Sequence, residues 1–122
     1  MKIQESGENY LETILILQKT RPVVHAVDVA LELDFAKASV SRGLGILQEA
    51  KLINVDNSGG ITFTERGLVR AEEVYARHKV LTAFLANLGI DRTIAEEDAC
   101  RIEHVISVET FETIKKIVEK KK

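Results

Sequence analysis

The fold is decided by residues 26–64, which read AVDVALELDFAKASVSRGLGILQEAKLINVDNSGGITFT. Apolar residues at helical spacing predict a short helix over residues 26–33 and a longer one over residues 35–50. Asp34 lies between them and is expected to cap the second helix. Two helices joined by a tight turn, the second exposing small polar and basic side chains, are typical of a helix-turn-helix.

The end of this stretch predicts a β-hairpin, because the β-prone residues 52–55 and 61–64 flank a turn-forming cluster at residues 56–60. Taken alone, each piece is equally explained by plain packing. A hairpin directly after a helix-turn-helix makes a winged helix-turn-helix, and the ordered combination favours DNA binding. The acidic and polar wing tip is a poor phosphate contact. The side chains expected to contact DNA lie on the second helix: Lys37, Ala38, Ser39, Ser41 and Arg42.

Composition sets limits on the function. The chain has 122 residues, of which 45% are hydrophobic, and a net charge of −2. The length fits one domain or two small subdomains, and the acidic balance argues against a generic nucleic-acid binder. DNA affinity must then come from local geometry and a few cations.

A single cysteine cannot form an internal disulfide, so a cytoplasmic location is expected. No apolar run has membrane-spanning length, so no membrane association is expected.

Helices are also predicted outside the decisive stretch. Apolar periodicity indicates a first helix over about residues 6–20 and a long helix from Thr64 to about residue 88. One more is expected to start near Asp91 or Thr93 and to run to about Ile106, and another to run from Ser107 to the end. The apolar faces of these last two helices exceed what one small bundle can bury, which predicts a homodimer.

The fifth predicted helix carries four potential metal donors on one face. Glu96, Cys100, Glu103 and His104 fall within roughly a third of a helical circumference. Thiolate, imidazole and carboxylate ligands suit a divalent first-row metal such as Fe²⁺, Mn²⁺, Co²⁺, Ni²⁺ or Zn²⁺. Four donors on one helix cannot enclose an ion, so another helix must complete the site. The best-placed candidates for this are Asn9, Glu12 and His78.

Each donor also has a simpler structural explanation. Glu12 could be a solvated helix carboxylate, and His78, on an apolar helix face, a hydrogen-bonded core residue. Cys100 could be a small buried hydrophobe. Thr93 to Glu96 fits a capping box, which competes with metal binding by Glu96. No His-Glu-x-x-His motif occurs and no position is left open for water activation, so an enzyme is not expected.

Three segments, together with the winged helix-turn-helix, carry a resemblance to a known family. Residues 9–14 (NYLETI), 75–78 (YARH) and 98–105 (DACRIEHV) resemble the diphtheria toxin repressor family of iron- and manganese-dependent bacterial transcriptional regulators. The resemblance covers nearly the whole chain, and Cys-Arg-x-Glu-His is its most specific piece. It implies a metal-dependent repressor that binds double-stranded operator DNA as a homodimer.

The resemblance also implies roles for individual residues. Cys100, Glu103 and His104 resemble the primary-site ligands, completed from the first helix. Glu12 matches the carboxylate that the manganese-responsive branch uses there, and Asn9 stands where family members carry Met or Asp. His78 matches a histidine of an ancillary or second site.

The second site departs from the family pattern. Glu96 falls where the iron-responsive branch has a second histidine, and Thr82 replaces a carboxylate. The lack of an SH3-like C-terminal domain resembles the manganese-responsive branch, whereas Cys100 resembles the iron-responsive one. The expected cofactor is therefore Fe²⁺ or Mn²⁺, with Zn²⁺, Co²⁺ or Ni²⁺ as substitutes.

The resulting prediction is a mainly α fold, with a winged helix-turn-helix DNA-binding domain over residues 1–64. A helical dimerisation and metal-binding domain is expected over residues 65–122. Two alternatives stay open at this point. One is a metal-independent winged-helix regulator with a vestigial metal site. The other is a small metal-binding or hydrolytic protein.

Overall fold

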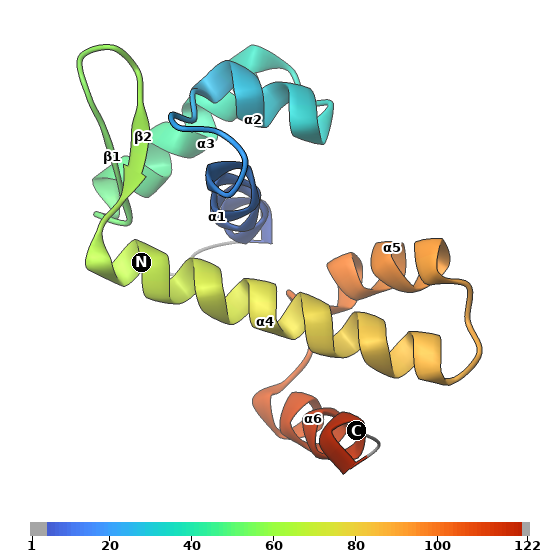
Figure 1. Cartoon of the computed structure of the whole chain (residues 1–122). Helices are drawn as coiled ribbons and strands as arrows, with labels where there is room; N and C mark the ends of the chain where they lie inside the picture. Colours follow the sequence, from blue (N-terminus) through green and yellow to red (C-terminus); the bar gives the residue numbers. More distant parts are fainter. Residues whose placement is uncertain (1–4, 121–122) are drawn as a thin grey trace. The chain divides into compact units, whose positions relative to one another are not determined.

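The computed structural model describes residues 5–120 and is mainly helical, as the sequence predicts (Figure 1). The elements, in chain order, are α1 (Glu5–Gln18), α2 (Ala26–Leu33), α3 (Lys37–Glu49), β1 (Ile53–Val55), β2 (Ile61–Phe63), α4 (Glu65–Asn87), α5 (Arg92–Ile102) and α6 (Val108–Lys120). The chain forms two compact units that divide between Glu72 and Glu73, inside α4. The predicted domain boundary, after Thr64, falls directly before α4 and stays a prediction.

The first unit has one apolar core built from α1, the helix-turn-helix and the hairpin. Leu11 and Ile14 of α1 and Val40 of α3 are fully buried in it. These residues recur at the three- and four-residue spacing that places them on one face of their helices. The remaining members of the core are Tyr10, Leu17, Val24, Val29, Ala30, Leu44, Leu47, Leu52, Ile53, Ile61 and Ala71.

Asp34 does not cap α3 as predicted; it ends α2. Its backbone is left-handed, with φ of 56°, and its N–H bonds to the Ala30 carbonyl. The N-cap of α3 is Ala36, which makes no side-chain cap hydrogen bond. Aspartate tolerates the left-handed conformation better than most residues. The tight turn between the helices needs such a residue, so Asp34 serves the end of α2.

Gly43 allows α1 to pack directly against α3. A Cβ atom at this position would overlap the ring of Tyr10, which is buried. Gly45, in contrast, has open space where its Cβ would stand. The helix therefore carries one glycine that close packing requires and one that it does not.

The wing is a two-stranded antiparallel hairpin that pairs Ile53 with Phe63 and Val55 with Ile61. Its turn is organised by Asp56. One carboxylate oxygen of Asp56 accepts hydrogen bonds from the hydroxyl and the N–H of Ser58, at 2.8 and 2.9 Å, and from the N–H of Gly60 at 2.8 Å. These bonds, first among them that of the Ser58 hydroxyl, hold the pKa of Asp56 below its ordinary value.

The ends of α4 follow the sequence prediction. The Thr64 hydroxyl accepts a hydrogen bond from the N–H of Gly67 at 3.0 Å, which caps the start of the helix. At the other end, Gly89 has a φ of 97° and the Ile90 N–H bonds back to the Leu85 carbonyl. A left-handed glycine with this bond is the usual way to end a helix.

Helix α5 begins at one of its two predicted starts, near Asp91, but ends earlier than predicted. The N-cap is Asp91, whose carboxylate accepts a hydrogen bond from the Thr93 N–H at 3.1 Å. The predicted capping box at Thr93 is therefore wrong. The helix ends at Ile102, whose carbonyl accepts hydrogen bonds from the Val105 and Ile106 N–H groups of the turn that follows. Ser107 caps α6 as predicted, with its hydroxyl accepting from the Thr110 N–H at 3.1 Å.

Within the second unit, α5 runs back alongside the C-terminal half of α4, and α6 lies on the other side of that half (Figure 1). Val74 and Leu81 of α4 are buried here, as are Ala95 and Ala99 of α5. None of the described helices is both long enough and apolar enough to cross a membrane.

Candidate metal centre

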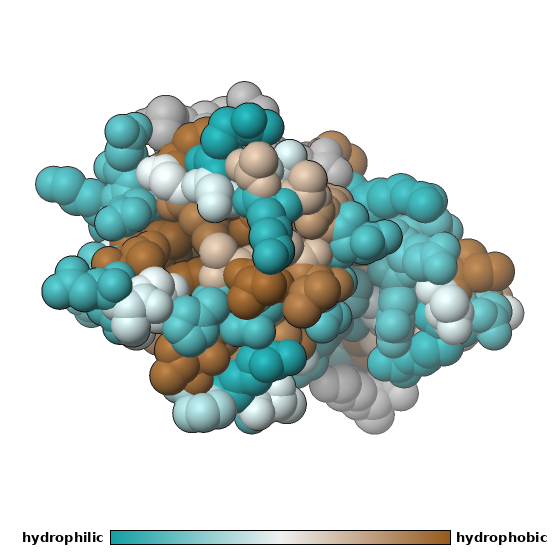
Figure 2. Space-filling view, turned by 90° about the horizontal axis from the view of Figure 1, so that it is seen from above, coloured by the Kyte–Doolittle hydropathy of each residue, from teal (hydrophilic) through white to brown (hydrophobic). Residues whose placement is uncertain are grey.

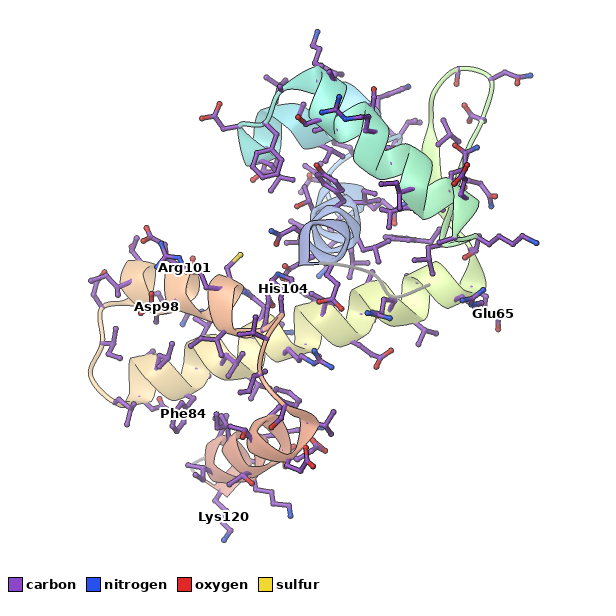
Figure 3. The ribbon with its side chains drawn as sticks, turned by 180° about the vertical axis from the view of Figure 1, so that it is seen from behind. Glu65, Phe84, Asp98, Arg101, His104 and Lys120 are labelled. Atoms are coloured by element: carbon purple, nitrogen blue, oxygen red, sulfur yellow. The ribbon has the colours of Figure 1, made fainter. Side chains whose placement is uncertain are left out.

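Three of the predicted metal donors converge at the C-terminal end of α5. Cys100 lies in the last turn of the helix, and Glu103 and His104 lie in the turn that follows it. Figure 3 shows His104 just past the end of α5, where the chain leaves the helix. One donor atom from each of the three residues lies within 4.8 Å of the other two. The predicted Cys-x-x-Glu-His cluster therefore forms, although its last two residues are outside the helix.

Glu103 is the centre of this cluster. Its side chain is fully buried. The Oε1 atom lies 3.6 Å from Nδ1 of His78 and 3.5 Å from Nε2 of His104. Among the residues that the structure describes, neither carboxylate oxygen of Glu103 has a hydrogen-bond partner. A buried carboxylate without hydrogen bonds is costly unless a cation compensates its charge.

The donor set fits a transition-metal ion. Ligands at about 2.1 Å from a metal stand roughly 3.0–3.5 Å apart in octahedral or tetrahedral geometry. The separations of 3.5 and 3.6 Å around Glu103 are close to this range. Imidazole, carboxylate and thiolate together match the preferences of Fe²⁺, Co²⁺, Ni²⁺ and Zn²⁺, and the harder ligands also suit Mn²⁺. Oxygen-binding Ca²⁺ would need neither cysteine nor histidine.

His78 reaches the cluster from a different element. It lies in the C-terminal half of α4, with 22% of its side chain exposed. Because α4 and α5 pack together, a histidine on the apolar face of α4 points at the end of α5. This placement agrees with the prediction that a second helix supplies part of the coordination.

One predicted donor, Glu96, does not join the cluster. Glu96 is exposed, and its Oε1 atom lies 3.4 Å from Nε of Arg92, one helical turn earlier. It belongs to none of the donor groups found among residues 5–120. Thr82 is buried, and its hydroxyl has no hydrogen-bond partner in the described part of the chain. We therefore leave Glu96 out of the proposed metal site.

Asn9 and Glu12 lie one turn apart on α1, in the first unit. The Glu12 side chain is buried and Asn9 is half-buried. Their spacing places both side chains on one side of the helix. Their part in binding a metal stays a prediction.

Arg77 is a residue near the centre that the sequence reasoning missed. Its guanidinium Nη1 donates a hydrogen bond to the backbone carbonyl of Glu103 at 3.2 Å. A basic residue on a mostly solvated helix gives no sequence signal of a backbone partner 26 positions away.

The residues predicted to contact DNA lie on α3. Of these, Lys37, Ala38, Ser41 and Arg42 are exposed, and Ser39 is half-buried. The opposite side of the helix is buried through Val40, Leu44 and Leu47. Figure 2 views the molecule of Figure 1 from above, and on this face apolar residues (brown) are gathered among hydrophilic ones (teal). Thus α3 packs into the core with one side and leaves most of the residues predicted to contact DNA accessible on the other.

Two family models match the chain in consecutive segments. The model described as "Iron dependent repressor, N-terminal DNA binding domain" matches residues 2–61. The model described as "Iron dependent repressor, metal binding and dimerisation domain" matches residues 64–122. Together these matches cover nearly the whole chain.

Curated relatives match over similar lengths. An uncharacterized HTH-type transcriptional regulator of Methanocaldococcus jannaschii is 32% identical over 120 residues, covering 97% of this chain and 96% of the relative. The transcriptional regulator MntR of Escherichia coli is 30% identical over 117 residues, covering 96% of this chain and 76% of the relative. Both relatives are named as transcriptional regulators.

Solved structures share the fold. A manganese-dependent transcriptional repressor in complex with manganese superposes with a TM-score of 0.86 at 24% identity, over 93% of this chain and 52% of that one. The manganese regulator SloR superposes with a TM-score of 0.83 at 24% identity, over 98% and 55%. The chain thus spans about half the length of these two proteins.

Proposed function

The chain belongs to the diphtheria toxin repressor family of iron- and manganese-dependent transcriptional repressors, and we propose that its DNA binding is switched by a metal ion held at Cys100, Glu103, His104 and His78. One observation carries the choice of site. Glu103 is a fully buried carboxylate with two imidazole nitrogens within 3.6 Å and without a hydrogen bond from any described residue. Such a carboxylate is suited to bind a cation.

We infer that α1 completes the coordination through Glu12. Two arguments support Glu12 as a ligand: the family resemblance and the coordination chemistry of the ion. Glu12 matches the carboxylate that the manganese-responsive branch uses, and an ion with two imidazoles, one thiolate and one carboxylate accepts a further oxygen ligand. Asn9, one turn earlier, offers an amide oxygen, which is a weaker ligand than a carboxylate.

The metal follows from the donor chemistry. The thiolate of Cys100 favours Fe²⁺ over Mn²⁺, whereas the carboxylates of Glu12 and Glu103 suit both ions. We therefore propose Fe²⁺ or Mn²⁺ as the physiological ion. Zn²⁺, Co²⁺ and Ni²⁺ accept the same ligands and would act as substitutes in vitro.

We propose that α3 reads the operator in the major groove. Lys37 and Arg42 are exposed cations that can contact phosphates or guanine edges, and Ala38 can meet a thymine methyl group. Ser39 and Ser41 can donate to phosphate oxygens or base edges. The wing presents Asp56 and Asn57 at its tip, so its contribution to phosphate binding is small.

We propose that the chain acts as a homodimer through its second unit. Large apolar side chains are exposed there: Leu88, Ile94, Val105, Val108 and Ile117. The two most exposed are Val105 and Val108, at 75% and 65%, and both are next to the α5–α6 turn. Burying such residues in a second copy would remove apolar surface from water. A two-fold dimer would then present its two α3 helices to half-sites about 34–36 Å apart.

When bound, the ion supplies a concentrated positive charge at the end of α5. In this proposal Glu103 and Glu12 share the ion as a counter-charge for their two carboxylates. We propose that this shared ion fixes α1, and with it α3, in the orientation that the operator requires. The coupling is reciprocal, so operator DNA must tighten metal binding by the same factor by which metal tightens operator binding.

A repressor acts where the chromosome is, and we propose a cytoplasmic location.

The test starts from the purified chain and a library of random duplex DNA. Sequences are selected in the presence of Mn²⁺, or of Fe²⁺ under anaerobic conditions, and the enriched duplex is then titrated with each metal and with a chelator. We expect tight binding with metal and a loss of about 100-fold or more with chelator. Equal affinity under chelation would contradict the proposal and favour a metal-independent regulator.

A further inference from the structure

Arg77, on α4, contacts two elements of the second unit at once. Its Nη1 atom donates a hydrogen bond to the backbone carbonyl of Glu103 at 3.2 Å. Its guanidinium carbon also lies 5.9 Å from the centroid of the Phe111 ring on α6. The first contact is a charge-assisted hydrogen bond, and the second is a cation–π contact within the usual distance. One side chain therefore connects the turn after α5 to α6.

The carbonyl that Arg77 holds is the one that joins Glu103 to His104. Glu103 is the C-cap of α5, so its carbonyl has no partner within the helix. The peptide group between two residues sets the directions of both their side chains. Fixing this carbonyl therefore fixes the relative orientation of the Glu103 carboxylate and the His104 imidazole.

We propose that Arg77 is a positioning residue for the metal site, which preorganises the Glu103–His104 turn and is itself held by Phe111. This inference rests on the proposed function, because it concerns the same site. Arg77 cannot bind a metal itself, since a guanidinium has no lone pair to donate. It acts through the geometry of the two ligands.

Charge and geometry predict opposite effects of removing Arg77. The positive charge of Arg77 repels a metal cation nearby. If this charge were its only effect, removing the guanidinium would tighten metal binding. If the hydrogen bond is what matters, its loss frees the Glu103–His104 turn and weakens metal binding. Substitution of residues that orient metal ligands typically lowers affinity 10- to 100-fold. The sign of the change in metal affinity thus separates the two roles.

The experiment compares variants of the full chain loaded with Co²⁺, which reports on the ligands through its visible spectrum. Affinity is measured by competition with a chromophoric chelator. Arg77→Met should bind Co²⁺ about 10-fold more weakly. Arg77→Lys, which keeps the charge and one donor, should recover part of the affinity. Arg101→Met is the matched control, because Arg101 is an exposed arginine of α5 that pairs with Asp98 at 3.3 Å.

Phe111 supplies a second test through a double-mutant cycle. Phe111→Leu should weaken Co²⁺ binding about two- to threefold, because Arg77 is then held by Glu103 alone. In the Arg77→Met background the same change should have no further effect. Fully additive effects would show that Phe111 does not act through Arg77 and would overturn that part of the proposal.

Three outcomes would overturn the role of Arg77: unchanged affinity in Arg77→Met, tighter affinity, or a fall in affinity that Arg101→Met reproduces. A large fall in the melting temperature of metal-free Arg77→Met would also overturn it, because the role would then be structural. Failure of the wild-type chain to bind Co²⁺ is a different result, which rejects the proposed function itself.

Discussion

Nδ1 of His78, in the middle of α4, lies 3.6 Å from Oε1 of Glu103, in the turn after α5. Two donors from elements far apart in the sequence are thereby brought to one point, and the carboxylate between them is fully buried. The packing of α5 on α4 creates this proximity. A cation at that point would stabilise the same packing, so metal binding and the fold of the second unit support each other.

Gly43 should tolerate no larger residue. Gly43→Ala places a methyl group into the Tyr10 ring, so α1 and α3 must move apart, at a cost of about 1–3 kcal/mol of unfolding free energy. Gly45→Ala is the matched control in the same helix, because its Cβ meets open space. It should stabilise the protein by about 0.5–1 kcal/mol. Urea unfolding of the metal-free variants measures both, and equal effects would contradict the account of Gly43.

Arg42→Ala and Lys37→Ala should each weaken binding to the selected DNA duplex. The slope of log affinity against log salt should fall by about one for each phosphate that the variant no longer neutralises. Lys116→Ala, on α6 and outside the DNA-reading helix, serves as the control. Fluorescence anisotropy over a range of salt concentrations gives both quantities. Unchanged affinity and slope for both variants would reject α3 as the DNA-reading helix in this orientation.

The wing should depend on the ionised form of Asp56. Hydrogen bonds from Ser58 and Gly60 hold its pKa below the ordinary value, so the carboxylate stabilises the turn while it is charged. This contribution is present above the unfolded pKa, about 3.9, and is lost as the pH falls through the lower folded pKa. Amide hydrogen exchange of Ser58 and Gly60 should therefore be faster in Asp56→Asn at neutral pH. Equal exchange in the variant and the wild type would contradict this role.

Asn9→Asp should tighten Mn²⁺ binding, because it replaces an amide oxygen with a carboxylate at the position where family members carry Met or Asp. The expected gain is on the order of 10-fold. Asn57→Asp, which adds the same charge at the exposed wing tip, is the control for a general electrostatic effect. A titration that is unaltered in Asn9→Asp, or equally changed in Asn57→Asp, would show that Asn9 does not contact the ion.

Most of the fold could be predicted from periodicity and capping residues. The bounds of α2 match the predicted helix over residues 26–33, and Thr64 and Gly89 mark the ends of α4 as expected. The errors occurred where two residues compete for one capping role. Asp34 ends α2 because the turn needs a left-handed residue, and of the two predicted starts of α5 the N-cap is Asp91, so the capping box predicted at Thr93 does not form. Local patterns do not reveal which of two competent caps the tertiary structure will use.

The site was predictable in composition but not in geometry. Cys100, Glu103 and His104 converge, as their spacing suggested, although the helix that was expected to align them ends at Ile102. Glu96 shares their helical face, but its carboxylate pairs with Arg92 on the exposed side of α5. Arg77 was missed because its partner is a backbone carbonyl, which no sequence pattern marks.

The most direct test of the central claim is Mn²⁺ binding by Glu103→Gln, followed by the electron paramagnetic resonance signal of free Mn²⁺. The substitution keeps the shape of the buried side chain and removes the charge that the ion compensates. Glu96→Gln is the matched control, since Glu96 is exposed in the same region. We predict that Glu103→Gln binds Mn²⁺ about 100-fold more weakly, with an undiminished melting temperature of the metal-free protein. Glu96→Gln should bind like the wild type. Wild-type affinity in Glu103→Gln would contradict the account.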